Sequence, residues 1–487
     1  MKRPSLRFLA SRKFWQRSAF ALACLATLII AAYAIENYRG EKVWSEYRAA
    51  AEARGVKLNF KDFIPPPIPD EENFAAIPIY RDLLSGDPAV RDRARKAVEL
   101  PVECGRFVAP GAPVDFPALG KCMVESALLA TTTDDPIADV LQGLERYEPV
   151  LAQMRQAVSR PRSRLDGEWE KGFDAAIWRM GNVLVIGQIA SLRVSALLAK
   201  GRGREALLDW RAGYRHAGVF QGEPTLLACM LRVMLVSIST ESVRRGLPSH
   251  GWSEAELEAI SKDLAAIDLM SDFTFGITSE RALVNGVLDQ VRANPTVWNH
   301  FWGGNSASGA KWLKLIPRGW IAQNQWHLNE WYDQQIARAV ASQDRPAMDI
   351  SSVTPKDISP PNFDLPQYWV RFPYWFVVAS TAYLSGGQLS TCRQVQTNAE
   401  LCLVTCALER FRLRHGDYPK ELDELVPSML SKQPRDRFDG QALRYRRTDD
   451  GGVILYSVGE DCRDDGGDDE RDSVFKLNPI LQKAREF

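Results

Sequence analysis

Residues 175–200 (AAIWRMGNVLVIGQIASLRVSALLAK) and 204–220 (REALLDWRAGYRHAGVF) are two apolar segments on either side of Gly201-Arg-Gly203. Both are rich in Leu, Ala and Arg, and their apolar residues recur with the spacing of a helix rather than of a strand. Glycines between two such segments indicate a tight turn. The stretch therefore predicts two antiparallel helices joined as a hairpin.

The sequence around this hairpin has the same character from about residue 136 to residue 345. A further apolar segment follows Pro224, and Ser253-Glu-Ala-Glu256 has the spacing of a helix-capping box. The Gly-x3-Glu-Ala-Leu pattern at Gly201–Leu207 resembles one tetratricopeptide-type hairpin. We therefore expect a mainly α domain of stacked antiparallel helices, weakly tetratricopeptide-like, over residues 70–345.

Composition limits the class of protein. The chain has 487 residues, of which 45% are hydrophobic and 25% are charged, which is typical of a folded protein. Lys plus Arg and Asp plus Glu both number 61, so the formal net charge is zero. Proteins that bind nucleic acid usually carry a basic excess, so we do not expect a nucleic-acid partner.

The N-terminus has the pattern of a membrane anchor. Residues 1–17 carry basic residues and no acid, and the next 18–35 carry no charge at all. A helix over this apolar stretch would be about 27 Å long, which is enough to cross the core of a bilayer. Because the basic flank stays in the cytoplasm, the rest of the chain is expected outside it.

A cleaved signal peptide is the alternative, because Ala32-Tyr33-Ala34 fits a cleavage site. The apolar run is long for a signal peptide, which favours an uncleaved anchor. Arg193 and Arg232 interrupt the two most apolar segments of the body, so neither is expected to span the membrane. The sequence thus predicts a single-pass membrane protein with its bulk outside the cytoplasm.

Proline-rich segments divide the remaining chain. Residues 36–69 read as an amphipathic helix that continues the anchor, followed by a stiff strut with the sequence Ile64-Pro-Pro-Pro-Ile-Pro69. Residues 346–366 carry several prolines and no apolar period, which indicates a linker. The predicted domains are therefore the helical domain at 70–345 and a C-terminal part at 367–487.

Eight cysteines are present, and Cys24 lies inside the apolar run. The others are odd in number, so at least one stays unpaired in a monomer. Cys104 and Cys122 flank a loop rich in Gly and Pro and are the predicted disulfide, since an exported chain reaches an oxidising compartment. Cys402 and Cys406 are four residues apart on a predicted helix and read as buried small apolar residues.

Tryptophans are concentrated in residues 298–331. They are Trp298, Trp302, Trp312, Trp320, Trp326 and Trp331. One interpretation is a sugar-binding platform of an envelope glycan-acting hydrolase, and another is a patch at the membrane interface. The third is that the rings pack between helices.

A different pattern begins near residue 375, where a long helix is expected to run to Arg414 and to end at Gly416. The apolar residues expected on one face of this helix are Leu401, Val404, Leu408, Phe411 and Leu413. A short helix at 420–426 follows. Two strands are expected at 442–447 and 453–458, with Asp449-Asp-Gly-Gly452 as the hairpin turn between them.

The order of these elements resembles the globular domain of type II secretion major pseudopilins and related type IV pilin-like proteins. The residues that carry the resemblance are Gly416-Asp417-Tyr418-Pro419, Pro434, Asp436, Phe438, Gly440, Leu443, Tyr445, Tyr456-Ser457-Val458-Gly459, Asp461, Gly466-Gly467 and Asp472. The whole chain also resembles exported proteins of planctomycetes and verrucomicrobia that carry this tail. This resemblance implies that the membrane is the bacterial inner membrane, with the bulk of the chain in the periplasm or exterior. A pseudopilin has its membrane helix directly before this domain, so here the resemblance implies a fused α+β module rather than a filament subunit.

In that family the acidic loop after the last strands binds calcium. The corresponding acidic loop of this chain is residues 460–472. The resemblance implies a calcium site here with Asp461, Asp464, Asp465, Asp468 and Asp472 as ligands. Calcium takes six to eight oxygen ligands, and Gly466-Gly467 would allow the loop to wrap tightly. The alternative is a solvated acidic loop whose charge is balanced by Arg444, Arg446 and Arg447.

Recognised catalytic motifs are absent from the sequence, including a P-loop, a dinucleotide-binding glycine pattern, a nucleophile elbow and the zinc motif His-Glu-x-x-His. The acid pair Glu168 and Glu170 is expected to point to different faces of a helix, unlike the paired carboxylates of a glycosidase. We therefore expect a non-catalytic, membrane-anchored protein whose helical body binds protein partners, in envelope or secretion-related assembly.

Overall fold

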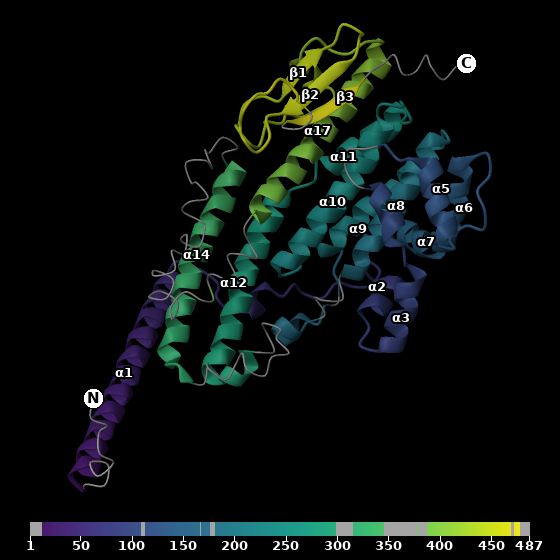
Figure 1. Ribbon diagram of the computed structural model, residues 1–487. Coiled ribbons are helices and arrows are strands. Elements are labelled where there is room, and N and C mark those ends of the chain that lie inside the picture. The colour runs from purple at the N-terminus through teal and green to yellow at the C-terminus, as the bar shows by residue number, and fades with distance from the viewer. Residues whose placement is uncertain are drawn as a thin grey trace, which may run out of the picture. The chain divides into compact units, whose positions relative to one another are not determined.

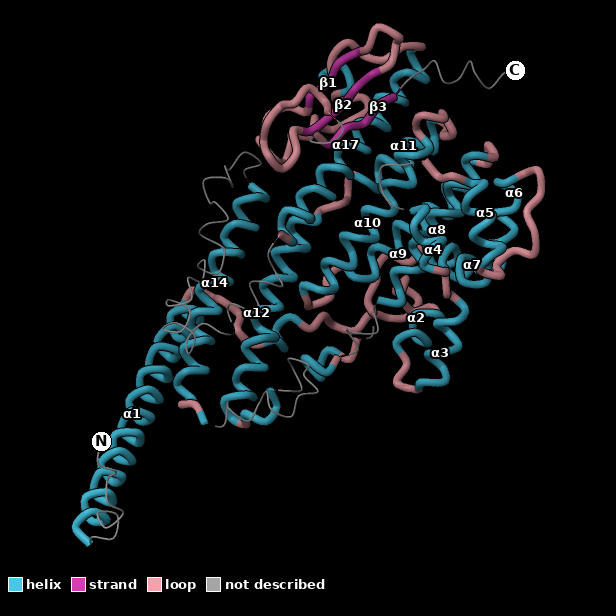
Figure 2. Tube along the Cα trace, in the orientation of Figure 1, coloured by secondary structure: helices cyan, strands magenta, loops and turns pink. Residues whose placement is uncertain are grey.

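The computed structural model describes residues 12–108, 113–165, 167–175, 181–298, 315–344, 377, 387–468 and 472–477 (Figure 1). It is mostly helical, with one small antiparallel sheet near the C-terminus (Figure 2). The chain divides into two compact units. The first comprises residues 1–60, 281–334 and 355–385, and the second comprises 61–280, 335–354 and 386–487.

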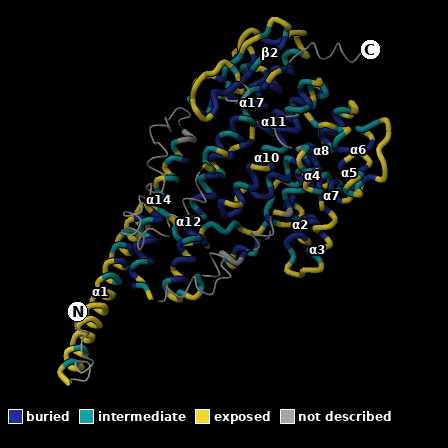
Figure 3. Tube along the Cα trace, in the orientation of Figure 1, coloured by how far each residue is buried: buried dark blue, intermediate teal, exposed yellow. Residues whose placement is uncertain are grey.

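The N-terminal helix α1 runs from Arg12 to Ala53 without a break. It is long and apolar enough to cross a membrane, and none of its most apolar window is buried inside the structure (Figure 3). A signal sequence near the N-terminus would have the same character. The predicted helix after the anchor is thus the continuation of one long helix rather than a separate element.

The first unit combines α1 with the second half of α12 (Leu269–Ala293) and the first part of α14 (Arg318–Asp344). Tyr47 of α1 donates a hydrogen bond of 2.8 Å to Asp333 of α14, and Arg281 of α12 pairs with the same carboxylate at 2.8 Å. Glu41 of α1 pairs with Arg292 at 2.9 Å. Charged side chains from three helices therefore link these elements.

The second unit is built mainly of helices. They include α2 (Pro78–Leu84), α3 (Pro88–Ala97), α4 (Val102–Gly105), α5 (Phe116–Glu125), α6 (Pro136–Leu144), α7 (Glu148–Ala157), α8 (Gly181–Ala199), α9 (Gly203–Ala217), α10 (Leu226–Gly246) and α11 (Glu254–Leu264). Helices α8 and α9 form the predicted hairpin, with Gly201 at a φ of 70° in its turn. The predicted capping box is present, because Ser253 accepts from the amide of Glu256 and Glu256 from that of Ser253.

Helix α10 is apolar and long, but it is a core helix. The structure buries 72% of its most apolar window, and Arg232 within it pairs with Asp272 at 2.6 Å. A buried charge is tolerated only when it is paired. The expectation that this segment does not span the membrane is consistent with that burial.

The C-terminal part begins with α17, from Gln388 to His415, which ends at Gly416 with a φ of 84°. A 3-10 helix at Leu422–Leu425 precedes the strands β1 (Arg444–Arg447), β2 (Val453–Ser457) and β3 (Ser473–Leu477). The strands pair antiparallel in chain order, with Arg444 opposite Tyr456. The sequence predicted β1 and β2 but not β3.

Helix α17 packs on α10 and α11 and also contacts β2 and β3. Its buried residues accordingly lie on more than one side, and they include Cys392, Val395 and Cys402. Leu413, which was expected on the buried face, is 43% exposed. Leu401, Val404 and Leu408 are fully buried as expected, so the prediction was wrong only for Leu413, and it did not include the further buried sides of the helix.

The predicted linker at 346–366 lies outside the described residues, so the boundary between the domains 70–345 and 367–487 stays a prediction. The two compact units differ from the predicted domains, since residues 61–280 and 386–487 belong to one unit. The contact of α17 with α10 and α11 accounts for this grouping.

Candidate functional site

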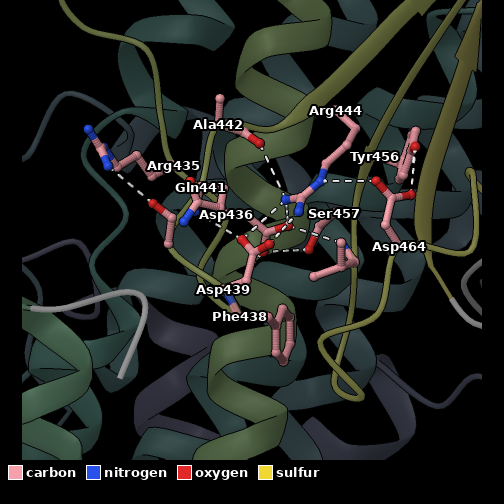
Figure 4. A network of polar contacts seen from close by, with 12 residues as sticks. Arg435, Asp436, Phe438, Asp439, Gln441, Ala442, Arg444, Tyr456, Ser457 and Asp464 are labelled. Atoms are coloured by element: carbon pink, nitrogen blue, oxygen red, sulfur yellow. Dashed lines mark hydrogen bonds and ion pairs between the residues drawn. The ribbon is translucent and has the colours of Figure 1, made fainter. Parts of the chain in front are cut away.

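The C-terminal module consists of α17, the three strands β1 to β3 and the segments between them. Asp436 forms the polar centre of this module (Figure 4). Its side chain is fully buried. One carboxylate oxygen accepts from the Ser457 hydroxyl at 2.8 Å and the Phe438 amide at 2.9 Å. The other accepts from the Val458 amide at 2.9 Å and the Arg444 guanidinium at 3.1 Å. These four donors compensate the cost of burying the charge.

Arg444 connects this centre to the acidic loop. Its guanidinium also binds Asp439, and its Nε lies 3.6 Å from Oδ2 of Asp464 (Figure 4). The other oxygen of Asp464 accepts from the Tyr456 hydroxyl at 2.9 Å. The amide of Gly466 and then the Tyr456 hydroxyl hold the pKa of Asp464 below its usual range. Asp464 is thus an ionised carboxylate at the surface end of the network.

Asp472 closes the other end of the loop. Its Oδ2 accepts from the amides of Gly467 at 2.8 Å and Asp468 at 3.0 Å. The side chain is buried, and its Oδ1 has no hydrogen-bond partner among the described residues. A buried carboxylate oxygen without a donor is costly, so this atom fits a site for a cation or a water molecule.

The structure places the predicted calcium ligands in two environments. Asp472 is buried, whereas Asp461, Asp464, Asp465 and Asp468 are exposed. No group of three or more His, Cys, Asp or Glu side chains within the described part of the chain could hold a metal ion as the loop stands. Residues 469–471 lie outside the described part. The buried oxygen of Asp472 is thus of the type that calcium prefers, while the described residues of the loop do not bring further ligands around it.

The alternative prediction, a solvated acidic loop whose charge is balanced by arginines, agrees with the observed ion pairs only in part. Arg444 contacts Asp464, but Arg447 pairs with Asp417 at 2.6 Å instead. Arg447 thus contacts the turn after α17 rather than the loop.

A second buried cluster joins the turn after α17 to the helical body. Glu409 accepts a bond of 2.6 Å from Nδ1 of His250 and one of 3.0 Å from the Tyr418 hydroxyl. Arg412 also donates to Glu409. Although burial raises the pKa of Glu409, the bonds from His250 and Arg412 outweigh it and lower the pKa to about 2.

Sequence reasoning did not select His250 or Glu409, because the two residues are distant in the chain. One signal was available, since Tyr418 belongs to Gly416-Asp417-Tyr418-Pro419, which carries part of the resemblance. The structure assigns that tyrosine a structural role, because its hydroxyl donates to a buried carboxylate at the contact between α17 and the helical body.

Cys104 of α4 and Cys122 of α5 lie together, as the predicted disulfide requires. Both are buried, and their sulfur atoms are 2.7 Å apart without a bond. Burial, followed by the contact with Cys122, raises the pKa of the Cys104 thiol to about 12. The pairing stays a prediction that this proximity supports. Cys402 and Cys406 are both fully buried, as expected.

The described tryptophans of the 298–331 segment do not form an exposed platform. Trp331 is buried, and Trp298, Trp320 and Trp326 are half-buried. Trp320 donates to Glu36 of α1 at 3.1 Å. Trp302 and Trp312 lie outside the described residues. The interpretation that the rings pack between helices agrees best with this burial.

Glu168 and Glu170 border one cavity of about 1100 Å³, together with Tyr80 and Arg164. The expectation that both lie on one helix was wrong, because Glu168 has a φ of 54° and precedes the 3-10 helix that contains Glu170. Glu168 pairs with Lys171 at 2.6 Å. The cavity is therefore bordered by charges of both signs.

Comparisons with protein-family models, curated proteins and solved structures find no match to this chain.

Proposed function

We propose that the chain is a non-catalytic, membrane-anchored exported protein of the bacterial envelope. The helical body would bind protein partners, and the C-terminal module would be a pseudopilin-like domain stabilised by calcium. The observation that carries the proposal is α1, an uninterrupted helix whose apolar stretch is fully exposed in the absence of lipid. Exposed apolar surface of that length marks a site of interaction with a membrane or with another apolar surface, and its position at the N-terminus supports a membrane.

The pseudopilin-like assignment is supported by the arrangement of the module. A long helix ending at a left-handed Gly416 packs against an antiparallel sheet of β1, β2 and β3. Asp436, Ser457 and Tyr456, which carry part of the resemblance, belong to one hydrogen-bond network with Asp464.

Membrane extraction tests the anchor against the cleaved signal peptide. Alkaline carbonate removes peripheral and soluble proteins from membranes and leaves spanning helices in place. We expect the full chain to stay in the membrane pellet, and a variant with Leu25→Arg and Leu28→Arg to be lost from it, because two charges at the centre of the span are costly. A wild-type chain recovered in the soluble fraction would contradict an uncleaved anchor.

Calcium binding is proposed at the acidic loop, where Asp472 supplies a buried oxygen without a donor. Calcium would supply positive charge to that oxygen and draw the exposed carboxylates of the loop toward it. A ligand that binds only the folded state raises the melting temperature. We therefore expect the full chain in detergent to melt at a higher temperature in 1 mM CaCl₂ than in chelator.

Matched variants separate a specific site from a general ionic effect. Asp472→Asn is expected to abolish the calcium-dependent rise, because it removes the buried charged oxygen. Asp449→Asn changes an exposed carboxylate of the same module and is expected to keep the rise in full. If the wild-type chain shows no rise with calcium, the acidic loop is a solvated loop and the calcium proposal fails.

A further inference from the structure

Helices α10 and α17 run parallel in a constant register. Cys402 of α17 lies against the carbonyl of Thr240 in α10, with a sulfur-to-oxygen distance of 3.9 Å and a sequence separation of 162. Arg412 of α17 lies 3.2 Å from His250, just after α10, at the same separation of 162. An unchanged separation in sequence means that the two helices run in the same direction. Followed toward the N-termini, this register brings Cys229 to within one residue of Cys392, because their separation is 163.

The two thiols meet as the register requires. The Cys392 thiol is the first cause of the raised pKa of the Cys229 thiol, which places the two side chains next to each other. They are 3% and 0% exposed. Gly276 of α12 packs against Cys229, since a Cβ there would lie 3.0 Å from Cβ of Cys229. The pair is thus held in contact and closed off from solvent.

The other buried pair on α17 differs in geometry. Cys402 and Cys406 also contact each other, but they sit one turn apart on one helix, where both Cβ atoms point the same way. A disulfide needs the two Cα atoms within about 7 Å and Cβ atoms that approach each other. Facing residues on two packed helices meet that requirement better than successive turns of one helix.

We propose that Cys229 and Cys392 form a disulfide that fastens the C-terminal module to the helical body when the chain folds in an oxidising compartment. The oxidant is the disulfide of a thiol-disulfide oxidoreductase or of oxidised glutathione. Each cysteine gives up one proton and one electron, the bond between the two sulfurs forms, and the oxidant's disulfide is reduced to two thiols.

The burial of the two thiols determines the stage of folding at which the disulfide can form. The contact with Cys392, followed by burial, raises the pKa of the Cys229 thiol well above its usual range. The thiolate is the reactive species, so the folded reduced pair reacts slowly. Oxidation is therefore expected during folding, before α12 and α17 close over α10. The proposal rests on the export proposed above for its setting, but not for its chemistry.

The experiment refolds the detergent-solubilised full chain from denaturant in a buffer of reduced and oxidised glutathione. Free thiols are blocked with N-ethylmaleimide, and the protein is digested without reductant for mass spectrometry. We expect a peptide linked through Cys229 and Cys392, with Cys402 and Cys406 both alkylated as internal controls. Alkylation of both Cys229 and Cys392 in folded protein would overturn the proposal.

The same digest of protein taken directly from cell membranes separates this proposal from export. Linkage in both samples supports both proposals. Linkage only after refolding supports the disulfide geometry and counts against export. Alkylated Cys229 and Cys392 in both samples, with Cys104 linked to Cys122, would overturn the disulfide while leaving export intact.

Melting temperatures with and without reductant test the fastening role on the wild-type chain itself, so that the test does not depend on a variant that misfolds. Reductant is expected to lower the melting temperature of the wild-type chain by several degrees, because the bond closes a long loop. Cys392→Ser is expected to melt at the lower temperature and to lose most of the response to reductant. Reductant that leaves the wild-type melting temperature unchanged would contradict a fastening role.

Discussion

At the scale of single residues, the module contrasts two buried carboxylates. Asp436 receives four donors, so its charge is compensated within the fold. Asp472 receives two amides on one oxygen and none on the other among the described residues. The first is a structural centre, whereas the second is the atom on which the calcium proposal depends.

Removing the compensated carboxylate leaves its donors buried and unpaired. We expect Asp436→Ala to destabilise the module by about 3 kcal/mol, because Arg444 loses a buried partner and the Val458 amide loses its acceptor. Hydrogen exchange of the amides in β1 and β2 measures this loss locally. Asp449→Ala, an exposed change in the same module, is expected to leave exchange unchanged. Equal exchange in both variants would contradict a central role for Asp436.

His216 makes stability depend on pH. It is fully buried, with Nδ1 accepting from the Tyr80 hydroxyl at 2.6 Å and Nε2 donating to the Val183 carbonyl at 2.9 Å. Burial lowers its pKa to about 4. The unfolded chain, with a histidine pKa of about 6.5, therefore binds the proton first as pH falls.

The contribution of His216 to the free energy of unfolding is at its maximum above about pH 6.5, the pKa of histidine in the unfolded chain. This contribution is lost as the pH falls toward the pKa of about 4 in the folded chain. Between pH 6 and pH 4.5 the free energy of unfolding should drop by about 1–2 kcal/mol through His216. His216→Gln is expected to be less stable at pH 7 but to lack this part of the slope. Denaturant titrations at several pH values measure it, and an identical slope in the variant would refute the assignment.

At the scale of elements, the sequence predicted those helices and strands whose signals are local. The hairpin of α8 and α9, the capping box of α11 and the turn between β1 and β2 were all readable from turn residues and periodicity. Strand β3 was missed because its five residues follow an acidic loop and only pair with β2 after a long connection. The exposed Leu413 was misplaced because the two partners of α17 are not encoded within that helix.

Two glycines let α1 and α14 approach closely in the first unit. A Cβ on Gly40 would lie 2.1 Å from the carbonyl oxygen of Gly319. We therefore expect Gly40→Ala to force the helices apart and to lower stability by several kcal/mol. Gly286→Ala on α12 has no atom within 4 Å of its new Cβ and should instead gain about 0.5–1 kcal/mol from helix propensity. Denaturant unfolding of both variants measures the difference, and equal effects would contradict the close crossing.

At the scale of the molecule, the mainly helical class and the apolar N-terminal helix were predictable, because both depend on composition and on long uninterrupted patterns. The candidate site was predictable only as a set of acids. That Asp472 alone is buried, and that Arg444 and Tyr456 hold Asp464, depends on the sheet bringing distant residues together. The pairing of Cys229 with Cys392 likewise required the packing of α10 on α17.

The orientation of the chain in the membrane is the central claim, and Cys462 allows it to be measured. All eight cysteines are described, and Cys462 is exposed whereas the others, apart from Cys24 in the apolar stretch of α1, are buried. A membrane-impermeant maleimide added to intact spheroplasts should therefore label the wild-type chain at Cys462, and a Cys462→Ser variant should stay unlabelled. Labelling of the wild-type chain only after the spheroplasts are lysed would place the C-terminal module in the cytoplasm and would contradict the account.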